Sequence, residues 1–152
     1  MTGSSFRFRL ERVRALRERR ETIAKQDLAR AISRLTVTQE ELAAADARLQ
    51  RARRHAREAT AQAVTVDAAE LQARQAFLEN VEATRRARSQ DVAQRQGEVA
   101  RRGAELTLAA GEHEMLIRLR ERQRSEHESE LSRLERNALD EMATVRFGRS
   151  VA

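Results

Sequence analysis

The stretch Thr60-Ala-Gln-Ala-Val-Thr-Val-Asp67 interrupts the helical pattern of this chain of 152 residues. Its three consecutive β-branched residues at positions 64–66 resist helix slightly, because their side chains lose rotamer freedom there. A helix start follows at once, since Asp67 is a good N-cap and Glu70 sits three residues later to complete a capping box. The stretch therefore predicts a turn over about residues 61–67, between two helices.

A regular apolar repeat precedes this turn. One row at spacing seven is Leu28, Leu35, Leu42, Leu49 and Ala56, and a second row three residues later is Ala31, Thr38, Ala45, Ala52 and Ala59. Alternating spacings of three and four form the a/d pattern of a left-handed coiled coil. Nearer the start the stripe is predicted to change phase, to Phe6, Leu10, Val13, Leu16 and Ile23. The first helix is expected over about residues 5–60, with Ser4 or Ser5 as its N-cap.

The second helix is predicted over about residues 68–146, with Gly148 as its C-terminal stop. Its apolar stripe is Leu71, Leu78, Val81, Val92, Val99, Leu106, Ile117, Leu131, Leu134, Ala138, Met142 and Val145. The predicted fold is all-α: one antiparallel two-helix coiled-coil hairpin over residues 1–152, with the second helix longer than the first. At 1.5 Å per residue, the second helix outruns the first by about 20 residues.

This inequality predicts an unpaired end. Residues near 123–147 have no counterpart on the first helix, so their apolar stripe from Leu131 to Val145 should be exposed. An exposed stripe of this kind usually marks a binding surface.

The composition excludes a thick globular core. Charged residues make up 36% of the chain and aromatic residues 3%, with no proline and no cysteine. Such a chain can fill the thin seam between two helices, and it offers neither disulfides nor thiolate metal sites. No apolar run approaches the roughly 20 residues that span a bilayer, and the start resembles no signal peptide, so we expect a cytoplasmic location.

Catalysis and metal binding are poorly supported by the sequence. There is no glycine-rich phosphate loop and no nucleophile placed with a base, so we expect no enzyme activity and no cofactor. His113 and His127 have acidic neighbours, but adjacent helical residues point in different directions, so we expect no metal site. Both histidines are interpreted as polar residues at the seam edge.

Arginine clusters and a net charge of +6 indicate attraction to acidic surfaces. Acidic residues interleave with most clusters and aromatic residues for base stacking are nearly absent, which argues against specific nucleic-acid binding. Two alternatives stay open: a basic coiled-coil nucleic-acid binder, and a structural spacer that dimerises as one continuous parallel coiled coil.

Two terminal segments resemble a known family. They are Phe6-Arg-Phe-Arg-Leu10-Glu-Arg-Val13-Arg-Ala-Leu16-Arg-Glu18 and Leu139-Asp140-Glu141-Met142-Ala-Thr-Val145-Arg146-Phe147. Both are similar to the corresponding ends of the flagellar type III export protein FliJ family, and length, lack of proline and the two-helix plan agree with it.

The resemblance implies a function. Members of the family form a hairpin similar to the central stalk of rotary ATPases, bind the hexameric export ATPase and the cytoplasmic domain of the export-gate membrane protein, and cycle export chaperones. They hydrolyse nothing themselves and act in the cytoplasm, peripherally associated with the inner-membrane export apparatus. The expected ATPase-binding residues are Phe6, Leu10, Val13, Leu16, Leu139, Asp140, Met142 and Arg146. The expected export-gate residues are Leu42, Leu49, Phe77 and Val81.

Overall fold

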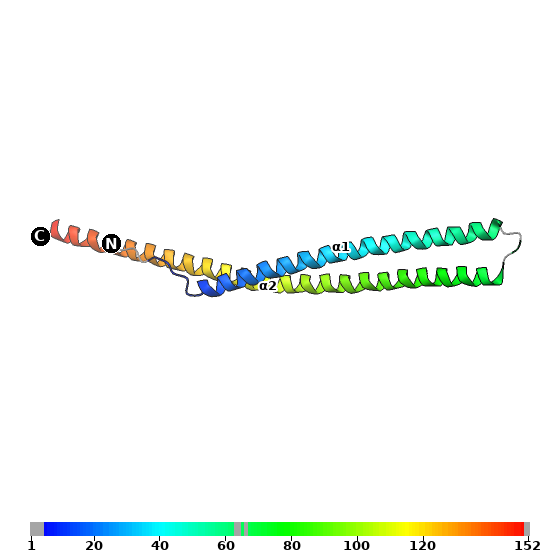
Figure 1. The fold of residues 1–152 in the computed structure, drawn as a ribbon. Coiled ribbons are helices and arrows are strands. Elements are labelled where there is room, and N and C mark those ends of the chain that lie inside the picture. Colours follow the sequence, from blue (N-terminus) through cyan, green and yellow to red (C-terminus); the bar gives the residue numbers. More distant parts are fainter. Residues whose placement is uncertain (1–4, 63–64, 66, 151–152) are drawn as a thin grey trace. The chain divides into compact units, whose positions relative to one another are not determined.

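The computed structural model describes residues 5–62, 65 and 67–150, with side chains described as far as residue 146. It contains two helices, α1 (Glu11–Gln62) and α2 (Ala68–Ser150), and the described residues form no strand (Figure 1). The chain divides into two compact units, which we call the turn unit (residues 23–107) and the terminal unit (residues 1–22 and 108–152). The predicted hairpin with a longer second helix is confirmed.

The seam of the turn unit follows the predicted heptad. All ten residues of the two predicted rows are buried or half-buried. The most buried residues of the unit are Ala31, Thr38, Ala45, Leu49 and Ala52 on α1 and Val81 and Val92 on α2. Small alanines at these positions allow the two helices to approach closely, so the core is a thin line of apolar contact.

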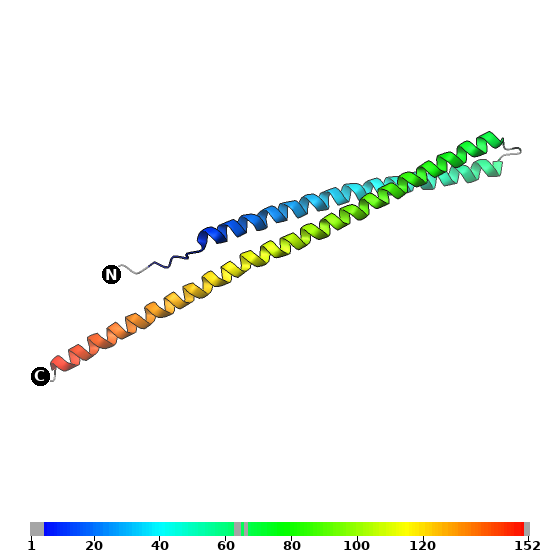
Figure 2. The same ribbon diagram turned by 90° about the horizontal axis from the view of Figure 1, so that it is seen from below.

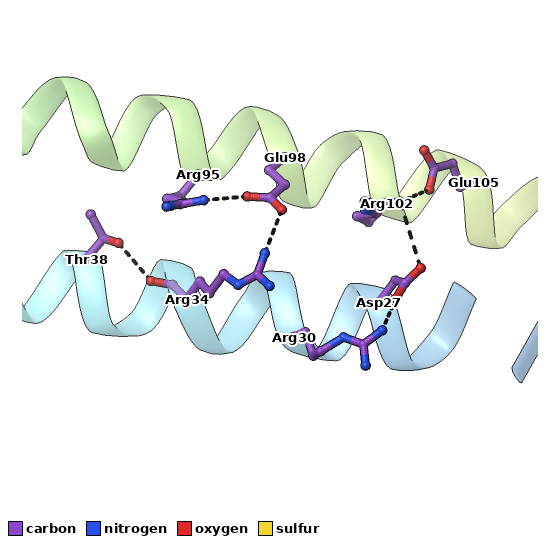
Figure 3. A network of polar contacts seen from close by, with 8 residues as sticks. All are labelled: Asp27, Arg30, Arg34, Thr38, Arg95, Glu98, Arg102 and Glu105. Carbon is purple, nitrogen blue, oxygen red and sulfur yellow. Dashed lines mark hydrogen bonds and ion pairs between the residues drawn. The ribbon is translucent and has the colours of Figure 1, made fainter. Parts of the chain in front are cut away.

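Ion pairs at the edges of this seam show the relative direction of the two helices. They join Arg53 to Glu82 at 2.7 Å, Asp46 to Arg85 at 2.8 Å, Glu41 to Arg88 at 2.9 Å and Arg34 to Glu98 at 3.2 Å. Residue numbers fall on α1 as they rise on α2, so the helices of this unit are antiparallel (Figures 2 and 3). Since α1 ends at Gln62 and α2 begins at Ala68, the alternative of one continuous helix is wrong.

The start of α2 has the predicted cap. The Asp67 Oδ1 accepts a hydrogen bond from the Ala69 backbone N–H at 3.3 Å, and the Asp67 carbonyl accepts the first helical bond from Leu71 at 3.0 Å. The Glu70 carboxylate accepts a hydrogen bond from Arg74 one turn later rather than from the Asp67 backbone amide, so Asp67 caps the helix as predicted but the predicted reciprocal bond of the capping box does not form. Asp67 therefore satisfies one of the amides that a helix N-terminus leaves without a partner.

The first helix begins later than predicted. Ser5 and the three residues after it are not helical, Ser4 lies outside the described residues, and α1 starts at Glu11. The Glu11 backbone N–H donates to the Phe8 carbonyl at 3.3 Å, and the Phe8 side chain is only 6% exposed. Burial of Phe8 by a non-helical approach to α1 outweighs the helix propensity of this segment.

The apolar stripe near the start of α1 does not become the seam. Arg17 and Glu21 are half-buried at positions that continue the heptad rows, whereas Leu16 is 51% and Ile23 55% exposed. The predicted change of phase is therefore wrong: the seam keeps its phase and is filled there by polar residues.

The predicted stop at Gly148 is also wrong. α2 continues to Ser150, and none of the described glycines has a positive φ. Gly148 therefore lies within the helix, where it takes ordinary helical geometry rather than the left-handed cap conformation.

Candidate partner-binding surfaces

The predicted ATPase-binding residues at the start of the chain differ in exposure. Phe6 is half-buried and its ring centroid lies 5.8 Å from that of His127, at an interplanar angle of 39°. Leu10, Val13 and Leu16 are exposed by 39%, 41% and 51%. Phe6 therefore packs the N-terminal segment onto α2, whereas the three aliphatic residues are exposed.

The last part of α2 is exposed on all sides. Between residues 121 and 146, every side chain is exposed except those of His127 and Leu131, which are half-buried. The large apolar residues in this segment are Leu134, Leu139, Met142 and Val145, with exposed fractions of 53%, 61%, 57% and 59%. We call residues 128–146 the tail of α2. The predicted exposure of its stripe beyond Leu131 is confirmed.

The two groups of predicted ATPase-binding residues occupy different parts of the terminal unit. Phe6 contacts His127, and Arg120 lies 3.9 Å from Glu11. Leu139 is twelve residues beyond His127, which corresponds to about 18 Å along the helix. The start of α1 and the tail of α2 are therefore two separate surfaces.

The four predicted export-gate residues do not share one environment. Leu49 and Val81 are 7% and 2% exposed, so their side chains lie inside the seam of the turn unit. Leu42 is half-buried, and Phe77 is 51% exposed. While the helices are paired, Phe77 is the member of this set that presents most of its side chain to a partner.

Polar pairs that the sequence did not predict cross the seam of the terminal unit. Arg17 pairs with Glu112, and the His113 Nδ1 lies 2.7 Å from a Glu21 carboxylate oxygen. His113 is half-buried at the seam, as predicted. The described residues hold no group of three or more His, Cys, Asp or Glu placed to share a metal ion. These pairs replace the leucines and alanines that fill the turn unit.

Two glutamates at the seam edge of the turn unit are held in their charged form. A hydrogen bond from Arg53 lowers the pKa of Glu82 from its usual 4.5. A hydrogen bond from Arg95, and next the charge of Arg34, lower the pKa of Glu98 in the same way. The lowered pKa of Glu82 therefore reports pairing with Arg53 of the opposite helix, whereas that of Glu98 comes first from Arg95 on its own helix and then from Arg34 of the opposite helix.

None of the described helical segments combines the length and the apolar character that a membrane span requires.

Comparison with known proteins places the chain in a family. A family model described as "Flagellar FliJ protein" matches residues 6–152. Neither a curated protein nor a solved structure matches the chain. Because the family model covers nearly the whole chain, the chain belongs to the FliJ family of flagellar proteins.

Proposed function

We propose that this chain is a non-catalytic component of flagellar type III export that binds the hexameric export ATPase through the tail of α2. Membership of the FliJ family gives it a function related to flagellar export. The finer proposal is that it acts as a central, stalk-like coiled coil, contacts the cytoplasmic domain of the export gate and assists the cycling of export chaperones. It would work in the cytoplasm at the inner-membrane export apparatus.

The exposed tail is the observation that carries this proposal. Leu134, Leu139, Met142 and Val145 each expose more than half of their side chains on one helical segment. Apolar side chains kept in water contribute nothing to the fold, and their burial by a partner gains about 25 cal/mol per Å². Charged residues such as Asp140 and Arg146 are interspersed among them and are also exposed, which suits the rim of an interface.

For the export gate, Phe77 supports the turn unit as the contact region. It is a large aromatic side chain, 51% exposed, on the first turns of α2. Leu42 is half-buried on α1 and adds apolar surface. Leu49 and Val81 would act indirectly, because their burial in the seam holds together the two helices that carry Leu42 and Phe77.

The ATPase proposal is tested by a variant that makes the tail polar. Leu134, Leu139, Met142 and Val145 are changed together to Gln in the full chain, and binding to the hexameric export ATPase and stimulation of its turnover are measured. We expect affinity to fall by about tenfold or more, because exposed apolar anchors dominate such interfaces. Deletion of the chain after Arg124 should abolish binding and leave the hairpin helical.

A matched control separates docking from a general loss of apolar surface. Ile32, Val37, Leu71 and Leu108 are also large, apolar and exposed, by 48%, 53%, 54% and 71%. Their change to Gln should leave ATPase binding unaltered. Normal stimulation by the tail variant, or equal losses in both variants, would show that the tail is not the docking surface.

A further inference from the structure

Many arginines of the turn unit lie in ion pairs, some across the seam and some within one helix. Those within 4.0 Å of a carboxylate are Arg30, Arg34, Arg53, Arg74, Arg85, Arg88, Arg95 and Arg102. Their charges are therefore balanced locally, and they account for the ion pairs at the seam edges (Figure 3).

A second group of arginines in the turn unit forms no ion pair with the described residues. Arg48, Arg51, Arg54 and Arg57 are exposed, and among the described residues no carboxylate lies within ion-pair distance of them. Residues 47–57 contain no aspartate or glutamate at all. We call these four residues the arginine face. Because they pair with nothing in the fold, their charge is available to a partner.

Three of the four side chains, those of Arg51, Arg54 and Arg57, lie on the side of α1 opposite the seam, whereas Arg48 lies at the seam edge, about 40° from the buried Ala52. At 100° per residue, Arg54 lies about 140° from Leu49 and about 160° from Ala56, both of which face α2. By the same rule Arg51 and Arg57 lie about 60° to either side of Arg54. The arginine face is therefore a convex, positively charged surface whose centre, at Arg54, points away from the other helix of the turn unit and whose edge reaches the seam at Arg48.

We propose that the arginine face binds the anionic headgroups of a phospholipid bilayer. Headgroups diffuse laterally and arginine side chains are long and flexible, so anionic lipids can gather where several arginines of the face reach the bilayer surface. Against a nucleic-acid partner, residues 47–57 contain no Phe, Trp or Tyr on which bases could stack. A location at the membrane export apparatus also favours lipid, and on this point the inference rests on the proposed function.

The size of the effect follows from electrostatics. Basic residues beside an anionic bilayer are attracted by its negative surface potential, and salt screens this attraction within about 10 Å. Binding should therefore require anionic lipid and weaken as salt is raised. Removal of four charges should lower the apparent affinity by up to about a thousandfold.

The test uses the full chain and vesicles, without the ATPase. Co-sedimentation is measured with vesicles of phosphatidylcholine containing phosphatidylglycerol, and with vesicles of phosphatidylcholine alone. The variant R48Q/R51Q/R54Q/R57Q should lose binding to the anionic vesicles and keep its helix content by circular dichroism. The same positions changed to Lys keep the charge and should keep the binding.

A control variant removes the same charge elsewhere. Arg30, Arg118, Arg124 and Arg133 are 62%, 76%, 66% and 64% exposed, and each pairs with an acid three or four residues away on its own helix. Their change to Gln should leave vesicle binding within a few-fold of that of the unmodified chain. The proposal is wrong if the unmodified chain does not prefer anionic vesicles or if both variants lose binding equally.

Two further points separate lipid binding by the arginine face from nucleic-acid binding and from ATPase docking by the tail. Tighter binding to duplex DNA than to anionic vesicles at equal phosphate concentration would overturn it in favour of a nucleic-acid partner. Since the vesicle assay contains no ATPase, a failure of ATPase docking by the tail variant leaves its result unchanged, so the two proposals can fail separately.

Discussion

The turn unit and the terminal unit are built from the same two helices, but their seams differ in how many apolar residues they bury. In the turn unit, Leu49 and Val81 are almost completely buried, and alanines line the rest of the seam. In the terminal unit, Leu10, Val13 and Leu16 are exposed, while Arg17 and Glu21 occupy seam positions. Both units also expose large apolar side chains, Phe77 in the turn unit among them, so the difference lies in the seam: apolar residues fill it in the turn unit and polar pairs cross it in the terminal unit.

The largest expected difference comes from truncating one leucine in each unit. Leu49→Ala removes a side chain that is 7% exposed and should lower the free energy of unfolding by about 2 kcal/mol. Leu139→Ala removes one that is 61% exposed and should change it by less than about 0.5 kcal/mol. Urea denaturation followed by circular dichroism measures both. Equal losses would contradict the division between the units.

Replacement of the mid-helix glycines should stabilise α2. A Cβ added at Gly97, Gly103 or Gly111 would meet no atom within 4 Å, and none of the three has a positive φ. Each Gly→Ala change should therefore raise the free energy of unfolding by about 1 kcal/mol, because alanine loses less backbone entropy in a helix. Thermal melts of the single variants check this, and a destabilised variant would show a packing role for that glycine.

Loss of the cap at the turn should have an effect of similar or smaller size. Asp67→Ala removes the acceptor of the Ala69 amide and should cost about 1 kcal/mol, whereas Asp67→Asn should cost little. The pair is compared by urea denaturation. A loss in the Asn variant equal to that in the Ala variant would mean that the hydrogen bond is not the source of the effect.

The smallest effect concerns acid. Because the folded-state pKa values of Glu82 and Glu98 are lowered from 4.5, their stabilising contribution is present above that pH and is lost as pH falls through the lowered values. The urea midpoint should therefore drop on acidification below 4.5. The Glu82→Gln variant, which removes the partner of Arg53 across the seam, should show a shallower drop, and an unchanged pH profile would argue against this pair.

Much of the turn unit could be predicted because its heptad is continuous. The rows from Leu28 to Ala59 gave the seam directly, and Asp67 gave the start of α2. Partners across the seam, such as Arg53 and Glu82, could not be predicted. Such a pair depends on the register between the two helices, and the sequence of one helix does not determine that register.

The terminal unit was predicted less well, for a physical reason. The sequence interpretation followed the apolar residues Val13 and Leu16, whereas the seam followed the heptad phase through Arg17 and Glu21. Polar residues that pair across a seam, as Glu21 does with His113, can keep a coiled coil in phase without apolar side chains. These positions continue the two seven-residue rows backwards, Glu21 from Leu28 and Arg17 from Ala31.

Burial of single side chains was also beyond the sequence pattern. Leu49 and Val81 were expected to form a partner surface with Phe77, but a residue on the seam cannot be separated from a residue beside it until the partner helix is placed. The start of α1 was mispredicted for the same reason. Burial of Phe8 depends on a tertiary contact, which local helix propensity does not reflect.

Hydrogen exchange with and without the hexameric export ATPase tests the division between the units most directly. In the free protein, amides of the turn-unit seam around Leu49 and Val81 should exchange slowly, and those of residues 128–146 should exchange fast, because exposed helical segments open locally at low cost. On addition of the ATPase, protection should rise in residues 128–146 and stay unchanged in the turn unit. Protection that rises only in the turn unit, with the tail unaffected, would contradict the account.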